Sequence, residues 1–163
     1  MRILGIDPGT AITGFSIIET KAGHTRLLDF GCIRTKAGLK QGTRLNQIAT
    51  DISTLIKKWK PESASVEKLF FKKNVKTAMS VSEARGVIIQ KITENGLEIE
   101  EFTPLEIKSA VCGYGRADKR MVQEMVRITF NMKTIPKPDD AADAIAAALC
   151  LANSLKFKER LTA

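Results

Sequence analysis

As far as Arg34, the chain consists of short segments rich in apolar residues that are separated by polar turns, which is the pattern of β-strands. Two short turns, Pro8-Gly9-Thr10 and Lys21-Ala22-Gly23, interrupt this pattern. Turns this short join neighbouring antiparallel strands. The pattern therefore predicts an antiparallel meander of three strands, over Arg2–Asp7, Thr13–Glu19 and Thr25–Arg34.

From Thr43 the apolar residues recur at helical spacing up to Pro61, and strands then alternate with helices. The later predicted strands are Ser63–Val66 and Leu97–Phe102. The later predicted helices are Val75–Glu94, Pro104–Val111, Asp118–Phe130 and Asp139–Leu155. Strands joined through helices pair in parallel. We therefore expect an α/β fold with a five-stranded mixed sheet, in which the antiparallel meander is followed by parallel strands and helices cover both faces.

The helix predicted over Val75–Glu94 is apolar over a wider arc than one sheet face requires. At about 100° per residue its apolar side chains span roughly 220°, whereas a stripe of about 100° is enough to cover a sheet. These side chains are Val75, Ala78, Met79, Val81, Ala84, Ile88, Ile89 and Ile92. The surplus indicates a second buried contact, made either by another protomer or by a neighbouring helix of the same chain.

The length of 163 residues suits one domain with a substantial core. We expect that domain over residues 1–155, followed by a charged, frayed tail over 156–163. No segment has the roughly 20 apolar residues of a membrane span, and the N-terminal apolar run is too short for a signal peptide. Cys32, Cys112 and Cys150 lie among apolar neighbours without a CxxC pair, so we expect small core residues in a reducing cytoplasm.

Lysine and arginine number 26 against 18 aspartates and glutamates, which gives a formal net charge of +8. A basic surface suits a polyanion, with nucleic acid the first candidate and an anionic membrane the second. A merely solvated coat of charge is the alternative. His24, the single histidine, lies in a turn and is expected to face solvent, so a histidine-based acid–base mechanism is not indicated.

Four carboxylates stand out against this basic background. Asp7 and Glu67 each end or follow a buried strand, and Asp140 and Asp143 share one face at the start of the last helix. Taken singly, a turn-forming role explains Asp7, and helix capping or the helix dipole explains acids in a first turn, with Asp139 as the expected N-cap. As a set they indicate a divalent-metal site with hard oxygen ligands, for Mg²⁺ or Mn²⁺. Such a site on a basic protein favours chemistry on a phosphodiester.

Several segments also resemble the RuvC family of bacterial Holliday-junction resolvases, from Met1 to about Leu155. They are Gly5-Ile6-Asp7-Pro8-Gly9-Thr10, Gly31-Cys32-Ile33-Arg34-Thr35, Val66-Glu67-Lys68-Leu69-Phe70-Phe71-Lys72-Lys73-Asn74, Ala84-Arg85-Gly86-Val87 and Asp140-Ala141-Ala142-Asp143-Ala144. The resemblance implies a ribonuclease-H-like fold. It also implies a crossover junction endodeoxyribonuclease whose catalytic and metal-binding set is Asp7, Glu67, Asp140 and Asp143.

The expected chemistry is two-metal hydrolysis. Two Mg²⁺ ions per site, with Mn²⁺ as a substitute, share Asp7 and act on the attacking water and on the leaving oxygen. The resemblance further implies 5′-phosphate and 3′-hydroxyl ends. It assigns Lys108 and Lys119 to the scissile phosphate, Arg85 to DNA and Phe70 to the junction centre. Lys72 and Lys73, beside the aromatic pair, are further DNA-binding candidates, because stacking and phosphate contacts often occur together.

The expected partners are four-way junction DNA, a second copy of the chain and no membrane. A C2 dimer would present two identical centres to two opposed strands. The resemblance adds a branch-migration motor complex of the RuvA and RuvB type. Three alternatives remain open: an ATP-binding module of the sugar-kinase and actin type, a non-catalytic nucleic-acid-binding relative, and a ribonuclease-H-like nuclease with another substrate.

Overall fold

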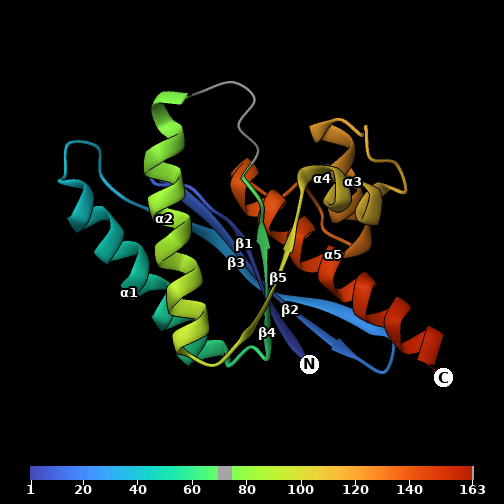
Figure 1. Ribbon diagram of the computed structural model, residues 1–163. Helices are drawn as coiled ribbons and strands as arrows, with labels where there is room; N and C mark the ends of the chain where they lie inside the picture. Colours follow the sequence, from blue (N-terminus) through green and yellow to red (C-terminus); the bar gives the residue numbers. More distant parts are fainter. Residues whose placement is uncertain (70–74, 163) are drawn as a thin grey trace.

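A computed structural model of the chain describes residues 1–69 and 75–162, and it contains the predicted five-stranded sheet (Figure 1). The strands are β1 (Arg2–Asp7), β2 (Ile12–Lys21), β3 (His24–Arg34), β4 (Ser63–Glu67) and β5 (Glu98–Phe102). They lie in the order β3-β2-β1-β4-β5. The β1–β2 and β2–β3 pairs are antiparallel, and the β1–β4 and β4–β5 pairs are parallel. The meander and the parallel extension are both confirmed.

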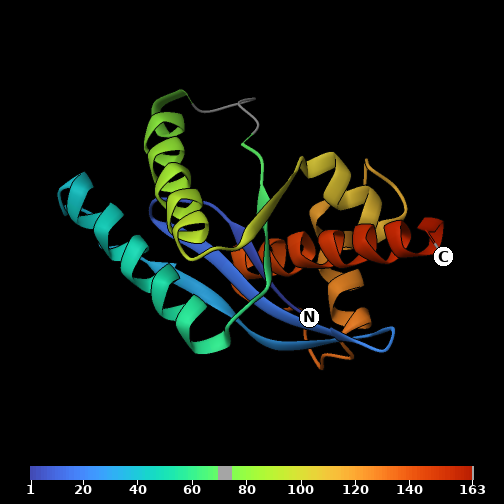
Figure 2. The same cartoon turned by 60° about the horizontal axis from the view of Figure 1, so that its bottom comes forward.

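Helices cover both faces of the sheet, as predicted (Figures 1 and 2). On one face lie α1 (Gln41–Trp59) and α2 (Val75–Glu94). On the other lies α5 (Asp139–Thr162), with α3 (Pro104–Cys112) and α4 (Lys119–Thr129) packed against it. The central strand β1 is therefore covered on both sides, and its Ile3, Leu4 and Ile6 are fully buried. A strand buried on both faces has an apolar run rather than an alternation.

The helix α5 approaches the sheet closely because small residues line the contact. A methyl group added at Gly5 would collide with the Ala144 carbonyl oxygen, and one added at Gly14 would collide with the Asp140 carbonyl oxygen. The hydroxyl of Ser16 donates to the Ala144 carbonyl at 2.9 Å. Buried polar groups need such partners. The close approach fixes the start of α5 against β1 and β2.

We predict that Gly14→Ala destabilises the protein by about 1–3 kcal/mol, the usual cost of overpacking a tight contact. The added methyl group would push the first turn of α5, with Asp140, away from β2. Thermal and urea unfolding measure the cost. The control is Gly42→Ala on α1, where an added methyl group has no neighbour within 4 Å. Equal stability of the two variants would contradict the prediction.

The tail and the apolar arc of α2 differ from the simplest expectations. Where the sequence predicts a frayed tail, α5 continues to Thr162, and the Lys156 ammonium donates to the Gly23 carbonyl oxygen at 3.0 Å. On α2, Ala84, Ile88 and Ile92 are buried together with residues of α1, so a helix of the same chain covers part of the arc. Met79 nevertheless remains 74% exposed.

The burial of the cysteines agrees only in part with the sequence prediction. All three cysteines are free; Cys150 is buried as predicted, whereas Cys32 and Cys112 are only partly buried. His24 is exposed, as predicted. Within residues 1–69 and 75–162, no helix combines the length and the apolar character that crossing a membrane requires.

Candidate active site

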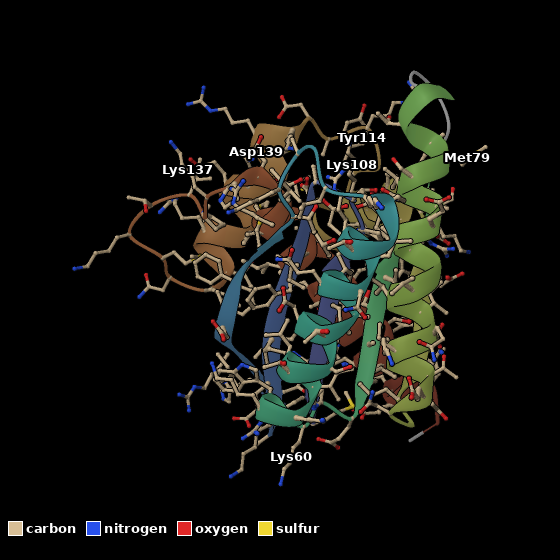
Figure 3. All side chains as sticks on the ribbon, turned by 90° about the vertical axis from the view of Figure 1, so that its left-hand side faces the viewer. Lys60, Met79, Lys108, Tyr114, Lys137 and Asp139 are labelled. Atoms are coloured by element: carbon tan, nitrogen blue, oxygen red, sulfur yellow. The ribbon has the colours of Figure 1, made fainter. Side chains whose placement is uncertain are left out.

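The four predicted acids gather at one edge of the sheet. Asp7 ends β1 and Glu67 ends β4, and these strands are parallel neighbours whose carboxyl ends meet at the same edge. Asp140 and Asp143 belong to the first turns of α5, which pass over β2 at Gly14, the residue paired with Asp7. In Figure 3 the labelled side chains of Lys108 and Asp139 lie at the same end of the molecule, far from Lys60.

The loop after Asp7 is held by the hydroxyl groups of three threonines. The Thr13 hydroxyl donates to the Gly9 carbonyl oxygen at 2.6 Å. The Thr10 hydroxyl donates to the Ser80 carbonyl oxygen of α2 at 2.7 Å, and the Thr35 hydroxyl donates to the Thr10 carbonyl oxygen at 2.6 Å. These bonds tie the loop to α2 and to the end of β3, and so hold the end of β1 in place.

Burial and repulsion between carboxylates raise the pKa values of Asp7, Glu67 and Asp143. The pKa of Asp7 lies well above its usual value, because the carboxyl is buried and because Glu67, Asp143 and Asp140 are close enough to repel its charge. Burial, and then the charge of Asp143, raise the pKa of Glu67 to about 7. The pKa of Asp143 is raised mainly by burial, although Lys119 opposes the rise. Carboxyl groups whose ionisation is disfavoured by burial and by neighbouring carboxylates are found more often at functional sites than elsewhere.

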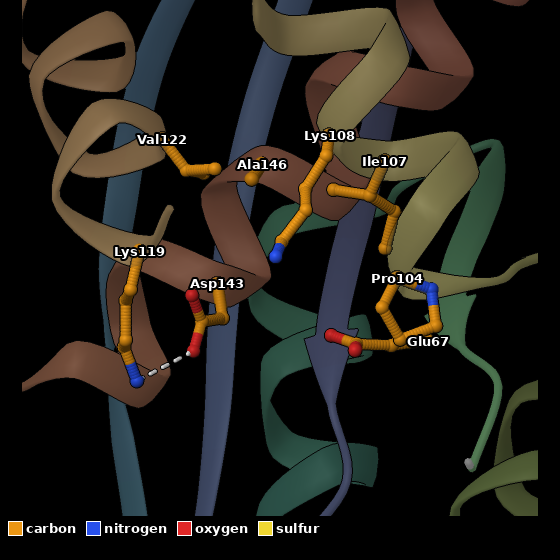
Figure 4. Close-up of a pocket in the computed structure, with 8 residues that line it drawn as sticks. All are labelled: Glu67, Pro104, Ile107, Lys108, Lys119, Val122, Asp143 and Ala146. Atoms are coloured by element: carbon orange, nitrogen blue, oxygen red, sulfur yellow. Dashed lines mark ion pairs between the residues drawn. The ribbon is translucent and has the colours of Figure 1, made fainter. Parts of the chain in front are cut away.

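Two lysines complete the site. The Lys119 ammonium of α4 lies 3.1 Å from Asp143 Oδ2 and 3.3 Å from Asp139 Oδ2. Burial lowers the pKa of Lys119, but the contacts with Asp143 and Asp139 raise it by more. Lys108 of α3 and Lys119 line one pocket of about 170 Å³ together with Glu67 and Asp143 (Figure 4). The two predicted lysines therefore face the same space as two of the four predicted acids, Glu67 and Asp143.

The donor set suits a hard divalent cation, although the carboxylates do not close around one point. In the described part of the chain, no three His, Cys, Asp or Glu side chains form a ready chelating group. One of the four acids, Asp143, is paired with the Lys119 ammonium at 3.1 Å. Carboxylate oxygens are the ligands that Mg²⁺ and Mn²⁺ prefer, so the residues fit such an ion.

Of the four other predicted DNA-binding residues, the structure describes only Arg85. Phe70, Lys72 and Lys73 lie outside the described residues. Arg85 forms an ion pair with Glu101 of β5. Glu101 precedes Phe102, which is paired with Glu67, so the Arg85–Glu101 pair lies on the opposite face of the sheet from the Glu67 carboxylate. The Arg85–Glu101 pair links α2 to β5, and a role of Arg85 in DNA binding stays a prediction.

Asp139 is the residue that the sequence interpretation misjudged. It was expected as an N-cap, but it is the first residue of α5, and its carboxylate contacts Lys119 and accepts a hydrogen bond from Gln123 Nε2 at 3.0 Å. Its spacing of four from Asp143 places both acids on one helix face, and this was the available signal.

The fold and the site define a nuclease of the ribonuclease-H-like class. The family model described as "Crossover junction endodeoxyribonuclease RuvC" matches residues 3–151. The chain belongs to the RuvC family.

Relatives and solved structures agree with this assignment over the whole chain. The crossover junction endodeoxyribonuclease RuvC of Chloroflexus aurantiacus is 51% identical over 160 residues, which is 98% of each chain. The Thermus thermophilus RuvC structure superposes with a TM-score of 0.88 at 29% identity, over 97% of both chains. T. thermophilus RuvC in complex with a Holliday junction substrate gives a TM-score of 0.87 at 26% identity, over 96% of both chains.

Proposed function

We propose that the protein resolves four-way DNA junctions during recombination and repair by nicking two opposed strands, leaving 5′-phosphate and 3′-hydroxyl ends. The observation that carries the proposal is the meeting of Asp7, Glu67 and Asp143 with two lysines at one edge of a fold shared with the RuvC family. The junction as substrate is supported by the similar T. thermophilus RuvC, whose structure holds a Holliday junction.

Membership of this nuclease family implies dependence on a divalent metal. We propose Mg²⁺, with Mn²⁺ as a substitute, held by Asp7, Glu67, Asp140 and Asp143, two ions per site. Bound ions of this kind supply a lowered pKa for the attacking water and charge stabilisation for the leaving oxygen. The four carboxylates would hold the ions in a half-buried position at the sheet edge, where electrostatic interactions are stronger than in bulk water.

The chain's own cations would hold the substrate. Lys108 and Lys119 border the pocket beside Glu67 and Asp143. A phosphate in that pocket would meet two ammonium groups, which stabilise negative charge that develops at phosphorus. The net charge of +8 supplies the wider attraction to the DNA backbone, so binding should weaken steeply with salt. Phe70, Lys72 and Lys73 remain proposed DNA contacts.

The proposed partners follow from the symmetry of the substrate. A four-way junction has approximate two-fold symmetry, so a C2 homodimer would place one centre at each of two opposed strands. The exposed Met79 on α2 suits such an interface, since exposed apolar side chains on a helix face favour association. Cooperation with a branch-migration motor of the RuvA and RuvB type and a cytoplasmic location complete the proposal.

A cleavage assay tests the proposed function. With Mg²⁺, we expect symmetric nicks in a synthetic four-way junction and none in a linear duplex of the same sequence, and no nicks in either with EDTA. End-labelled strands on a denaturing gel locate the cuts. Equal cutting of duplex, or cutting of RNA in preference to the junction, would instead favour a ribonuclease-H-like nuclease with another substrate.

A further inference from the structure

Asp139 stands beside the proposed catalytic acids but has no part in the proposed function. Its Oδ1 accepts the hydrogen bond from Gln123 Nε2 at 3.0 Å, and its Oδ2 lies 3.3 Å from the Lys119 ammonium. The same ammonium lies 3.1 Å from Asp143 Oδ2. Two side chains of α4 thus meet two acids of α5, and Lys119 is shared between a proposed metal ligand and an acid outside that set.

Helix geometry separates the two neighbours of Asp143. At about 100° per residue, Asp143 lies about 40° from Asp139 on one side and about 60° from Asp140 on the other. Asp140 is on the sheet side: besides burial, its charge raises the pKa of the Cys32 thiol on β3. Asp139 is on the side of α4, where it contacts Gln123 and Lys119. Asp143 can therefore face a cation with Asp140 while Asp139 still faces Lys119.

The Lys119–Asp139 ion pair contributes little to the stability of the fold. The two side chains are 54% and 59% exposed, and ion pairs this exposed contribute little to folding. A divalent cation and the Lys119 ammonium would compete for the Asp143 carboxylate. When the cation takes that carboxylate, a lysine with no second partner would be free to move into solvent.

We propose that Asp139, oriented by Gln123, is a positioning residue that keeps the Lys119 ammonium at the site when a divalent cation takes Asp143. The retained ammonium then faces the phosphate of the bound strand. The inference rests on the proposed function, and it adds a residue that acts only through Lys119.

A double-mutant cycle tests this dependence. The proteins are the wild type, Asp139→Asn, Lys119→Met and the double variant, each measured by single-turnover cleavage of a junction at saturating protein and Mg²⁺. We expect Asp139→Asn to slow cleavage by about 10- to 100-fold, because a misplacement of about 1 Å can cost about 100-fold in rate. In the Lys119→Met background, Asp139→Asn should have no further effect, since groups that act as one unit are not additive.

A second readout needs no cleavage. The rise of the melting temperature with Mg²⁺, measured without DNA, reports how strongly the cation competes with Lys119 for Asp143. In Asp139→Asn, Asp143 is the remaining carboxylate partner of Lys119 in the cluster, so Lys119 competes more strongly with Mg²⁺. The Mg²⁺ concentration that gives half of the rise in melting temperature should therefore increase several-fold. Lys119→Met should lower this concentration, and the double variant should match Lys119→Met.

The control variant is Asp118→Asn. It removes the same charge next to Lys119, but Asp118 caps α4 by accepting the Met121 N–H at 2.8 Å, and asparagine can keep that cap. We expect wild-type behaviour in both assays. Effects of Asp118→Asn as large as those of Asp139→Asn, or a full Asp139→Asn effect in the Lys119→Met background, would overturn the role of Asp139. A wild-type protein that leaves the junction uncut would overturn the proposed function instead. The dependence of the melting temperature on Mg²⁺ in the four proteins would still test the role of Asp139.

Discussion

Replacing Asp7 with asparagine is expected to lower junction cleavage by about 10³-fold or more, because groups that stabilise transition-state charge in enclosed sites have effects at this scale. Asp7 is more deeply buried than Glu67 and Asp143, and the charges of Glu67, Asp143 and Asp140 all act on it. The Asp7 carboxylate would therefore be a ligand of any cation that these acids share. The measurement is single-turnover cleavage with end-labelled junction.

Junction binding by Asp7→Asn should stay equal to wild type or become slightly tighter. The substitution keeps the shape of the side chain and removes one negative charge that faces the DNA. The matched control is Asp51→Asn on α1, which removes the same charge on the opposite face of the sheet and should cleave normally. Loss of binding in parallel with loss of cleavage would show that Asp7 has a structural role in the loop after β1.

The acidic edge could be predicted because it follows from local patterns. Asp7 and Glu67 each terminate an apolar run, and the helix predicted between β3 and β4 makes β4 parallel to β3 and β1, so the carboxyl ends of β1 and β4 point to the same edge. Asp140 and Asp143 were predicted from helical spacing. The alternation of the elements predicts the strand directions, whereas the position of β4 beside β1 is a feature of the folded sheet.

The features that sequence reasoning missed depend on long-range packing. Arg85 lies across the sheet from the site because Glu101 and Phe102 alternate faces on β5, and their direction is set by the pairing of β5 with β4. The extra length of α5 is stabilised by the Lys156 contact with Gly23, which is distant in the sequence. The partner of Asp139 depends on how α4 packs against α5. The contacts of Arg85 and Lys156 leave no periodic signal, and the spacing of Asp139 from Asp143 places it on a helix face without indicating its partner.

Without metal, the protein is expected to lose stability as the pH rises from about 5 to 7.5. The pKa of Glu67 is raised from 4.5 to about 7, and the pKa values of Asp7 and Asp143 are also raised. In that interval the unfolded chain has released protons that the folded chain still holds, so the free energy of unfolding falls with pH. For Glu67 the change is up to about 3 kcal/mol, at ~1.4 kcal/mol per pKa unit. Urea unfolding in EDTA at several pH values measures it.

Two comparisons show whether this pH dependence belongs to the site. Glu94 and Glu106 have lowered pKa values, so they act on stability below about pH 4.5, outside the interval. Glu67→Gln imitates the protonated side chain and should flatten the metal-free curve between pH 5 and 7.5. Mg²⁺ should reverse the trend in the wild type, because a cation binds the ionised carboxylates, releases their protons and stabilises the folded state more as the pH rises. A metal-free stability that increases between pH 5 and 7.5 would mean that the carboxylates at this edge do not repel one another, and with it the case for a shared cation would fail.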